Sequence, residues 1–162
     1  VAAPNAAVGG VLTCRYGLGK QGRGAAVSQL IELADFIGRW RLERRIHDHL
    51  GPTGHLTGTA TFTPETKGLR LTEQGQLTLG ESSFAAERHY LWHADHSAIE
   101  VSFDDGRFFH RFAPQGVPTA THWCDPDQYD VTYDFSRWPE WSSTWLVKGP
   151  RKDYEMHSNY MR

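Results

Sequence analysis

Cysteine and long apolar segments are both scarce in this chain. Cys14 and Cys124 are the two cysteines among its 162 residues. Two thiols are too few for the disulfide framework that holds small secreted domains together, so we expect them to be free. No apolar run approaches the roughly 18 residues that a membrane-spanning helix needs, and we therefore expect no membrane insertion.

A surplus of charge of one sign is also missing. The chain has 17 Lys and Arg against 19 Asp and Glu, which gives a formal net charge of -2. Proteins that bind nucleic acid neutralise its phosphates with basic residues, and acidic membrane surfaces attract the same kind of charge. We therefore expect neither nucleic acid nor an acidic membrane surface to be a partner.

The start of the chain lacks the features of a targeting signal. Residues 1–26 are rich in Ala and Gly, without the basic start and long apolar stretch of a signal peptide. Residues 11–14 match a lipoprotein cleavage site poorly. We interpret residues 1–26 as a disordered extension, or as sequence translated upstream of a true start near Val27. Residues 27–162 are then a single domain, and the cytoplasm is the predicted location.

Turn-forming and aromatic residues are abundant. The chain has 16 Gly, 8 Pro and 6 Trp. Turn sequences such as residues 51–54 and 104–106 separate about ten short segments whose apolar residues alternate as in β-strands. The connections are too short for crossover helices, so an antiparallel meander is expected. The predicted strands cover residues 39–46, 55–63, 69–79, 84–93, 99–103, 107–112, 119–124, 129–135, 143–147 and 154–161.

A short helix precedes this meander in the prediction. Residues 28–37 have apolar residues at helical spacing, with Ser28 as N-cap and Gly38 at the stop. The meander that follows leaves two open edges unless it closes on itself. We therefore predict an all-β fold, a closed antiparallel up-and-down barrel of about eight to ten strands. A flat two-sheet sandwich is the structural alternative.

The two ends of the regular region carry a matching pair of features. Gly38 and Trp40 open the first strand, and Arg162 ends the last one. A guanidinium can lie on an indole face, so these residues are expected to mark where first and last strands meet. This pattern resembles the lipocalin and calycin superfamily of small-ligand barrels. The resemblance implies a calycin-like barrel with an internal cavity.

A longer set of motifs resembles a more specific family. The set comprises residues 36–40, 105–110, 122–124, 126–127 and 149–154. Together they are similar to a family of small lipocalin-like proteins of unknown function, from bacteria and some fungi. The resemblance implies a fold and no reaction. The missing leader and stapling disulfide argue against an extracellular carrier.

Two arginines are predicted to point into the barrel. Arg44 shares a face of the first strand with Trp40 and Leu42, and Arg88 alternates with Tyr90. A buried guanidinium needs an acid, several carbonyls or an anionic ligand. One interpretation pairs each arginine with an acid across the barrel or places it at the rim. The other has them hold a carboxylate, as an internal Arg and Tyr do in intracellular fatty-acid-binding proteins.

The histidines and the last cysteine are further candidates. Pairing Phe112 with Pro118 in a hairpin sets His110, His122 and Cys124 on one face, and a register slip of one residue separates them. Such a set can ligate zinc, and a single His can bind haem as in nitrobindins or transfer protons. The spacing is no metal motif, and hydrogen-bonded wall residues are the alternative. No cofactor is predicted, with haem and zinc kept open.

Tyr129 and Tyr133 share the inner face of one strand, where each hydroxyl needs a partner. Lys152 follows Arg151 in the last turn, where it either attracts an anion or is solvated. The cluster of Trp138, Trp141 and Trp145 is interpreted as a core plug or portal.

The predicted function is a barrel that binds a small, largely apolar molecule with an anionic or polar head. The alternatives are an enzyme that uses a cavity histidine for proton transfer in a cyclase, isomerase or dehydratase reaction, a haem or metal protein, and a partner-binding module. The candidate ligand-binding residues are Arg44, Arg88, Tyr90, His110, His122, Tyr129, Tyr133 and Lys152, and Gly38, Trp40 and Arg162 are the candidate closure residues.

Overall fold

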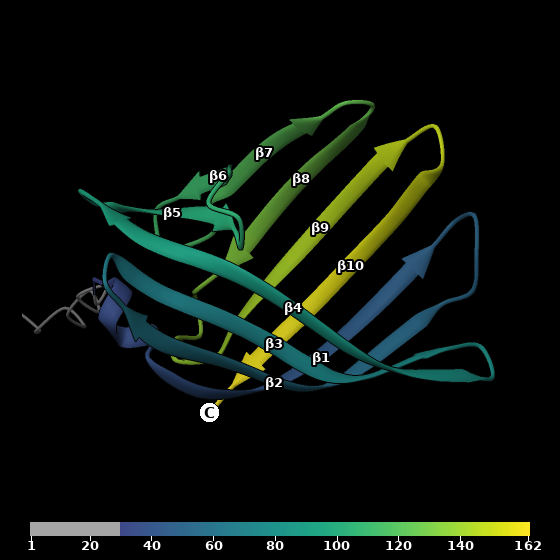
Figure 1. Ribbon diagram of the computed structural model, residues 1–162, viewed down its shortest axis with the longest axis horizontal. Helices are drawn as coiled ribbons and strands as arrows, with labels where there is room; N and C mark the ends of the chain where they lie inside the picture. The colour runs from purple at the N-terminus through teal and green to yellow at the C-terminus, as the bar shows by residue number, and fades with distance from the viewer. Residues whose placement is uncertain (1–29) are drawn as a thin grey trace, which may run out of the picture.

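The computed structural model describes residues 30–162 (Figure 1). The predicted extension at residues 1–26, Cys14 and the predicted cap Ser28 all lie outside these residues. No helix in the described part of the chain is long and apolar enough to cross a membrane.

Within residues 30–162, ten antiparallel strands form one sheet that curls into a barrel, which confirms the predicted all-β fold. Each predicted segment coincides with one strand to within a few residues. The strands are β1 (Gly38–Asp48), β2 (Gly54–Glu65), β3 (Gly68–Leu79), β4 (Ser82–Asp95), β5 (Ala98–Phe103), β6 (Phe108–Phe112), β7 (Thr119–Cys124), β8 (Asp127–Asp134), β9 (Trp141–Gly149) and β10 (Lys152–Met161). Their order in the sheet is β6-β5-β4-β3-β2-β1-β10-β9-β8-β7.

The barrel is nearly closed, with a seam between β6 and β7. The first and last strands pair along their length, from Arg41 opposite Met161 to Asp48 opposite Tyr154. At the other side, β6 and β7 end the sheet and do not pair with each other within the described residues. The predicted closure is therefore correct for β1 and β10 and incomplete at β6 and β7.

The connection between β6 and β7 explains the seam. The backbone of this connection forms hydrogen bonds with the end of β8 and with the residue that follows it. The N–H of Tyr133 donates to the carbonyl of Pro118, and the N–H of Phe135 donates to the carbonyl of Gly116. These bonds occupy backbone carbonyls of the connection, which are then not available for a β6–β7 hairpin. The hairpin that pairs Phe112 with Pro118, considered from the sequence, is therefore wrong.

The predicted helix shrinks to a single turn. In the described part of residues 28–37, only Leu33–Phe36 are helical, as a four-residue 3-10 turn (η1). So short a segment gains too few hydrogen bonds to form an α-helix without tertiary support. The N–H of Glu32 donates to the carboxylate of Asp35 at 2.8 Å, which stabilises the tight turn. The turn buries Phe36 completely in one end of the barrel.

Aromatic side chains fill that end around Phe36. The Phe36 ring lies between 5.0 and 6.5 Å, centroid to centroid, from Trp40, Phe62, Trp92, Phe135, Trp138 and Trp141. Aromatic pairs at such separations add stability beyond the area that they bury. This end is therefore a packed plug, and the space for a ligand lies further along the barrel.

Arg162 fastens the end of β10 to the start of β1. Its guanidinium lies 4.1 Å from the centre of the Trp40 ring. Its Nη2 also donates to the backbone carbonyls of Asp35 and Ile37, at 2.8 Å each. The left-handed backbone of Gly38, with φ of 119°, brings the chain from η1 into β1 at this contact.

Two glycines that face each other across β2 and β3 let the sheet bend there. Gly58 of β2 lies opposite Gly75 of β3. A Cβ atom on Gly58 would lie 2.0 Å from the carbonyl oxygen of Gln74, and one on Gly75 would lie 2.3 Å from that of Thr57. The strands can thus approach more closely than any side chain allows. Figure 1 shows β2, β3 and β4 curving together around the barrel.

Candidate functional site

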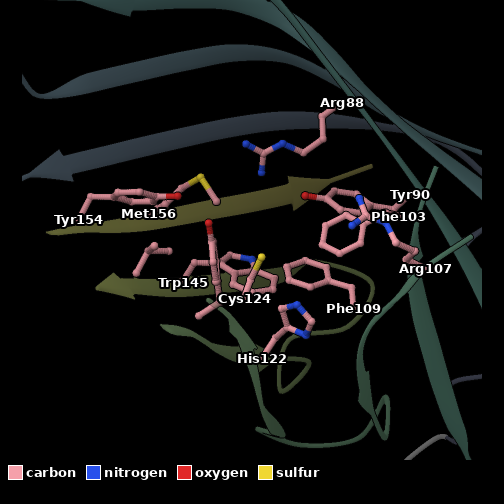
Figure 2. A pocket seen from close by; sticks show the side chains of 12 residues that line it. Arg88, Tyr90, Phe103, Arg107, Phe109, His122, Cys124, Trp145, Tyr154 and Met156 are labelled. Carbon is pink, nitrogen blue, oxygen red and sulfur yellow. The ribbon is translucent and has the colours of Figure 1, made fainter. Parts of the chain in front are cut away.

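A cavity of about 380 Å³ lies inside the barrel beside the seam (Figure 2). We call it the outer cavity. Strands from both sides of the seam contribute to its wall, so the gap in the sheet and the cavity occupy the same region. Its lining residues are Arg88, Tyr90, Phe103, Arg107, Phe109, His122, Cys124, Tyr129, Trp145, Val147, Tyr154 and Met156.

Phe109 is the centre of an aromatic wall. Its ring stacks on Trp145 at 5.1 Å between centroids, with an interplanar angle of 6°. Phe103 stacks on it at 4.5 Å, and Tyr90 lies nearly parallel at 5.9 Å. The His122 ring meets the Phe109 ring edge-on at 5.1 Å. A stack of flat rings suits a flat, largely apolar molecule.

Arg88 brings a positive charge into this aromatic surrounding. It extends from β4 over the space between Tyr90 and Tyr154 (Figure 2). Among the described residues, no carboxylate lies within ion-pair distance of its guanidinium. Arg107, the other arginine of the lining, is paired with Asp105 at 2.7 Å. The charge of Arg88 is therefore free to meet an anion in the cavity.

Arg44 instead has an acid across the barrel. Its Nη2 lies 2.7 Å from Oε2 of Glu73, and both side chains are almost fully buried. Its Nε donates to the hydroxyl of Ser158 at 2.7 Å. The hydroxyl of Tyr160 donates to Oε1 of Glu73 at 2.6 Å. The carboxylate pairing considered from the sequence is thus the arrangement that Arg44 adopts.

The pKa values of this pair keep both groups charged. Burial alone would raise the pKa of Glu73, but the positive charges of Arg44 and Arg88 outweigh it and hold that pKa below its usual value of 4.5. Burial alone would lower the pKa of Arg44, but Glu73 and Tyr160 raise it. Arg88 stands opposite Glu73 in the sheet. One carboxylate thus lies among two guanidinium groups, which leaves a net charge of one positive unit.

His110 lies deeper than the outer cavity. Its side chain is 2% exposed, and its Nε2 lies 2.8 Å from the hydroxyl of Tyr133. Burial, aided by the nearby His122, lowers the pKa of His110 to about 3. Burial also raises the pKa of Tyr133 well above 10.0. Both groups are therefore neutral near pH 7, and His110 is a weak base.

His122 and Cys124 line the outer cavity from β7, apart from His110 in the wall of the deeper space. No three His, Cys, Asp or Glu side chains within residues 30–162 are grouped so that they could hold a metal ion. The set of His110, His122 and Cys124 considered for zinc is therefore not assembled. Cys124 is a free, exposed thiol.

Lys152, at the mouth of the barrel, is already paired with two neighbouring side chains. Its ammonium lies 2.6 Å from the carboxylate of Asp127 and donates to the hydroxyl of Tyr129 at 2.8 Å. These two contacts raise the pKa of Lys152. Tyr129 in turn presents its ring to the outer cavity. Lys152 therefore positions Tyr129, and its charge is already balanced.

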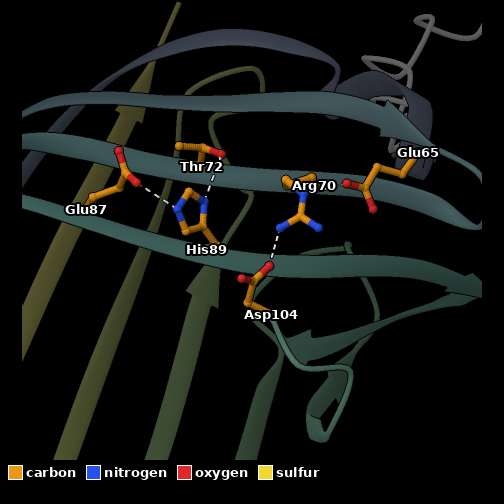
Figure 3. A network of polar contacts seen from close by, with 6 residues as sticks. All are labelled: Glu65, Arg70, Thr72, Glu87, His89 and Asp104. Carbon is orange, nitrogen blue, oxygen red and sulfur yellow. Dashed lines mark hydrogen bonds and ion pairs between the residues drawn. The ribbon is translucent and has the colours of Figure 1, made fainter.

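The hairpin that carries part of the aromatic wall is tied to the outside of the sheet (Figure 3). Arg70 of β3 forms ion pairs with Glu65 of β2 and with Asp104, which follows β5. Next to them, His89 contacts the carboxylate of Glu87 at 2.8 Å and the hydroxyl of Thr72 at 3.1 Å. Arg70 thereby holds the β5–β6 hairpin, with Phe103 and Phe109, over the cavity.

The structure adds residues that the sequence analysis did not select for the site. They are Glu73, Phe103, Arg107, Phe109, Val147, Tyr154 and Met156. Glu73 had a usable signal, because it falls in phase with the buried Leu69 and Leu71 on the inner face of β3. Trp145, considered as part of a plug, lines the cavity. Trp138 belongs to the packed end, and Trp141, which packs against Phe36 there, also lines the deeper space.

The fold and the cavity define a small antiparallel β-barrel with an internal, aromatic-lined cavity. The family model described as a family of unknown function (DUF6314) matches residues 36–162, and the chain belongs to this family. A family of unknown function is what the sequence motifs implied, whereas kinship with lipocalins stays a prediction. No curated protein matches the chain.

Solved structures that share this fold include the following two. One is the S-type phycobiliprotein lyase CpeS from Guillardia theta, with 10% sequence identity, 80% of this chain and 89% of that chain covered, and a TM-score of 0.57. The other is a protein of unknown function of the DUF3598 family from Nostoc punctiforme PCC 73102. It has 12% identity, a TM-score of 0.51, and covers 81% of this chain and 48% of that chain. At such low identity the likeness concerns the fold alone.

Proposed function

We propose that this protein binds a small molecule with a flat, largely apolar body and an anionic group, and that Arg88 holds the anionic group. The observation that carries the proposal is the guanidinium of Arg88, which has no carboxylate partner within residues 30–162 and reaches over an aromatic-lined cavity. The cavity volume of about 380 Å³ lies in the range of small-molecule sites.

The chemistry of Arg88 favours a carboxylate or a similar planar anion. A guanidinium donates two parallel hydrogen bonds to such a group, and it keeps its charge at any physiological pH. The exposed Arg88 is hydrated when the cavity holds solvent. A ligand anion replaces that water with charge-assisted hydrogen bonds, while the ligand body covers Phe109 and Trp145.

Two other functions receive less support. A haem or metal protein needs ligand groups that the described residues do not bring together. An enzyme that relies on His110 for proton transfer needs a stronger base than one with a pKa of about 3. The name of the phycobiliprotein lyase that shares the fold supports a small-molecule role for the barrel in general terms. The cytoplasm stays the proposed location.

Native mass spectrometry of freshly purified protein tests this proposal. We expect the wild type to retain a small anionic molecule and Arg88→Met to lose it, with the barrel still folded. Arg39→Met is the matched control, because Arg39 alternates with the buried Trp40 and therefore lies on the outer face of β1. A retained molecule that is cationic, or that Arg88→Met retains as well as the wild type, would show the proposal to be wrong.

A further inference from the structure

A second, smaller space lies deeper in the barrel than the outer cavity. We call it the inner chamber, and its volume is about 30 Å³. Arg88, Tyr90, Phe109 and Trp145 line both spaces, so the two adjoin. A molecule in the outer cavity can thus extend one end into the inner chamber.

Three nitrogen atoms without hydrogen-bond partners belong to residues that line this chamber. They are Nε1 of Trp92, Nδ1 of His110 and Nε1 of Trp141, and within residues 30–162 they are the buried side-chain polar atoms that lack a partner. All three residues line the chamber, and their exposed fractions are 2%, 2% and 3%. Leaving one buried donor unpaired costs about 1–3 kcal/mol. Because three unpaired nitrogen atoms belong to residues around one space, we look for one ligand group that would pair with them.

These nitrogens are suited to donate hydrogen bonds. An indole nitrogen is a donor only. A buried indole N–H usually has an acceptor, as in Trp40, whose Nε1 donates to the carbonyl of Phe36 at 2.8 Å. His110 is neutral, and its Nε2 lies 2.8 Å from the Tyr133 hydroxyl. When that hydroxyl donates to Nε2, the imidazole proton sits on Nδ1 and supplies a third donor to the chamber.

We infer that the inner chamber binds an uncharged hydrogen-bond acceptor, such as a carbonyl oxygen, at the inner end of the molecule whose anionic group Arg88 holds. The inference rests on the proposed function and narrows its ligand class. A chamber of about 30 Å³ has room for one or two oxygen atoms, so only a terminal group can enter.

The acceptor is uncharged because Arg88, the unpaired cation that lines both spaces, already holds the anionic group of the same molecule in the proposed complex. Arg44 also lines the chamber, but its charge is balanced by Glu73 at 2.7 Å. A buried anion facing neutral indole and imidazole groups would carry a large desolvation cost. The ligand is thus a conjugated or aromatic carboxylate with a carbonyl at the end opposite its carboxylate.

A matched pair of probes tests this inference. 4′-Acetylbiphenyl-4-carboxylate carries a ketone opposite its carboxylate, and 4′-ethylbiphenyl-4-carboxylate has the same shape without the acceptor. We expect the ketone to bind about tenfold more tightly in calorimetric titrations, because it pairs donors that are otherwise unpaired. In ¹H–¹⁵N spectra, the ketone should shift the indole N–H signals of Trp92 and Trp141 more than the ethyl probe does.

Two variants distinguish the effect of the indole donors on ketone binding from the effect of removing a large packed side chain. Trp92→Phe should remove most of the preference for the ketone, while Trp40→Phe, whose indole N–H is already bonded, should keep it. The spectra of the wild type give the same answer if a variant does not fold.

Equal affinity for the two probes with equal indole shifts would overturn the inference and leave the chamber as a site for water. The proposed function would survive that result if Arg88→Met still weakened both probes. Failure of the wild type to bind either probe would overturn both.

Discussion

The carboxylate of Glu73 and the guanidinium of Arg44 form an ion pair, with 2.7 Å between Oε2 and Nη2, inside the barrel. β3 supplies the acid and β1 the base, so the pair spans the strand between them. Because this carboxylate is fully engaged by Arg44 and Tyr160, the neighbouring Arg88 keeps an unbalanced charge. The pair therefore decides which of the two inward arginines is available to a ligand.

Removing the acid of this pair should destabilise the fold. Glu73→Gln leaves the Arg44 charge buried without a counterion, and we expect a loss of about 3–5 kcal/mol in the free energy of unfolding. Urea unfolding at pH 7 measures this loss in the free energy of unfolding. Glu81→Gln, at an exposed residue in the turn before β4, should change stability by less than about 0.5 kcal/mol. A loss below about 1 kcal/mol for Glu73→Gln would contradict the buried pairing.

His110 should make stability depend on pH in a defined direction. Its folded-state pKa of about 3 lies below the ordinary 6.5, so between these values only the unfolded chain takes up the proton. The folded state is therefore favoured above pH 6.5 and loses stability as the pH falls. From pH 6.5 down to 4.5 the expected slope is about 1.4 kcal/mol per pH unit.

Unfolding curves at several pH values check this slope. His110→Gln should flatten it, while His122→Gln, which alters a histidine of the outer cavity, should leave it in place. An unchanged slope in His110→Gln would mean that another group is responsible.

Arg162 should contribute to stability through the contact between first and last strands. Arg162→Ala removes the stacking on Trp40 and two hydrogen bonds to carbonyls, and we expect a loss of about 1–2 kcal/mol. Arg45→Ala is the control, because Arg45 is an exposed arginine on the outer face of β1 and should matter little. If both variants unfold at the same urea concentration as the wild type, Arg162 does not fasten the strands.

The ion pairs of Arg70 should restrain the β5–β6 hairpin. Asp104→Asn removes one of its two acidic partners. We expect the amides of residues 103–109 to exchange about two to five times faster with deuterium, since an exposed pair contributes up to about 1 kcal/mol. The amides of β9 are the internal reference. Equal exchange in the hairpin of variant and wild type would show that Arg70 does not hold it.

The sequence predicted the strands because their signals are local. Alternation in residues 39–46 and 129–135 places one face inside without knowledge of the partner strand. It also placed Arg44 and Arg88 on the inner face. Within the described residues, the helix predicted over 28–37 shortens to the single turn Leu33–Phe36, because apolar spacing over so short a segment does not supply the hydrogen bonds that stabilise an α-helix.

The features that the sequence could not reveal depend on contacts between distant strands. The partner of Arg44 lies 29 residues away, and the seam depends on backbone bonds that Tyr133 of β8 and Phe135, just after β8, form with residues 118 and 116. The inner chamber is lined by residues from several strands, among them Trp92 of β4, His110 of β6 and Trp141 of β9. No spacing in the sequence marks such a meeting point.

The account depends most on Arg88, and one titration tests it. The fluorescence of 1-anilinonaphthalene-8-sulfonate, an aromatic anion, reports its affinity for the wild type, Arg88→Met and Arg39→Met. We predict that Arg88→Met weakens binding by at least about tenfold, as expected for loss of a charge-assisted hydrogen bond, while Arg39→Met binds like the wild type. Equal affinity of all three proteins would contradict an anion site at Arg88.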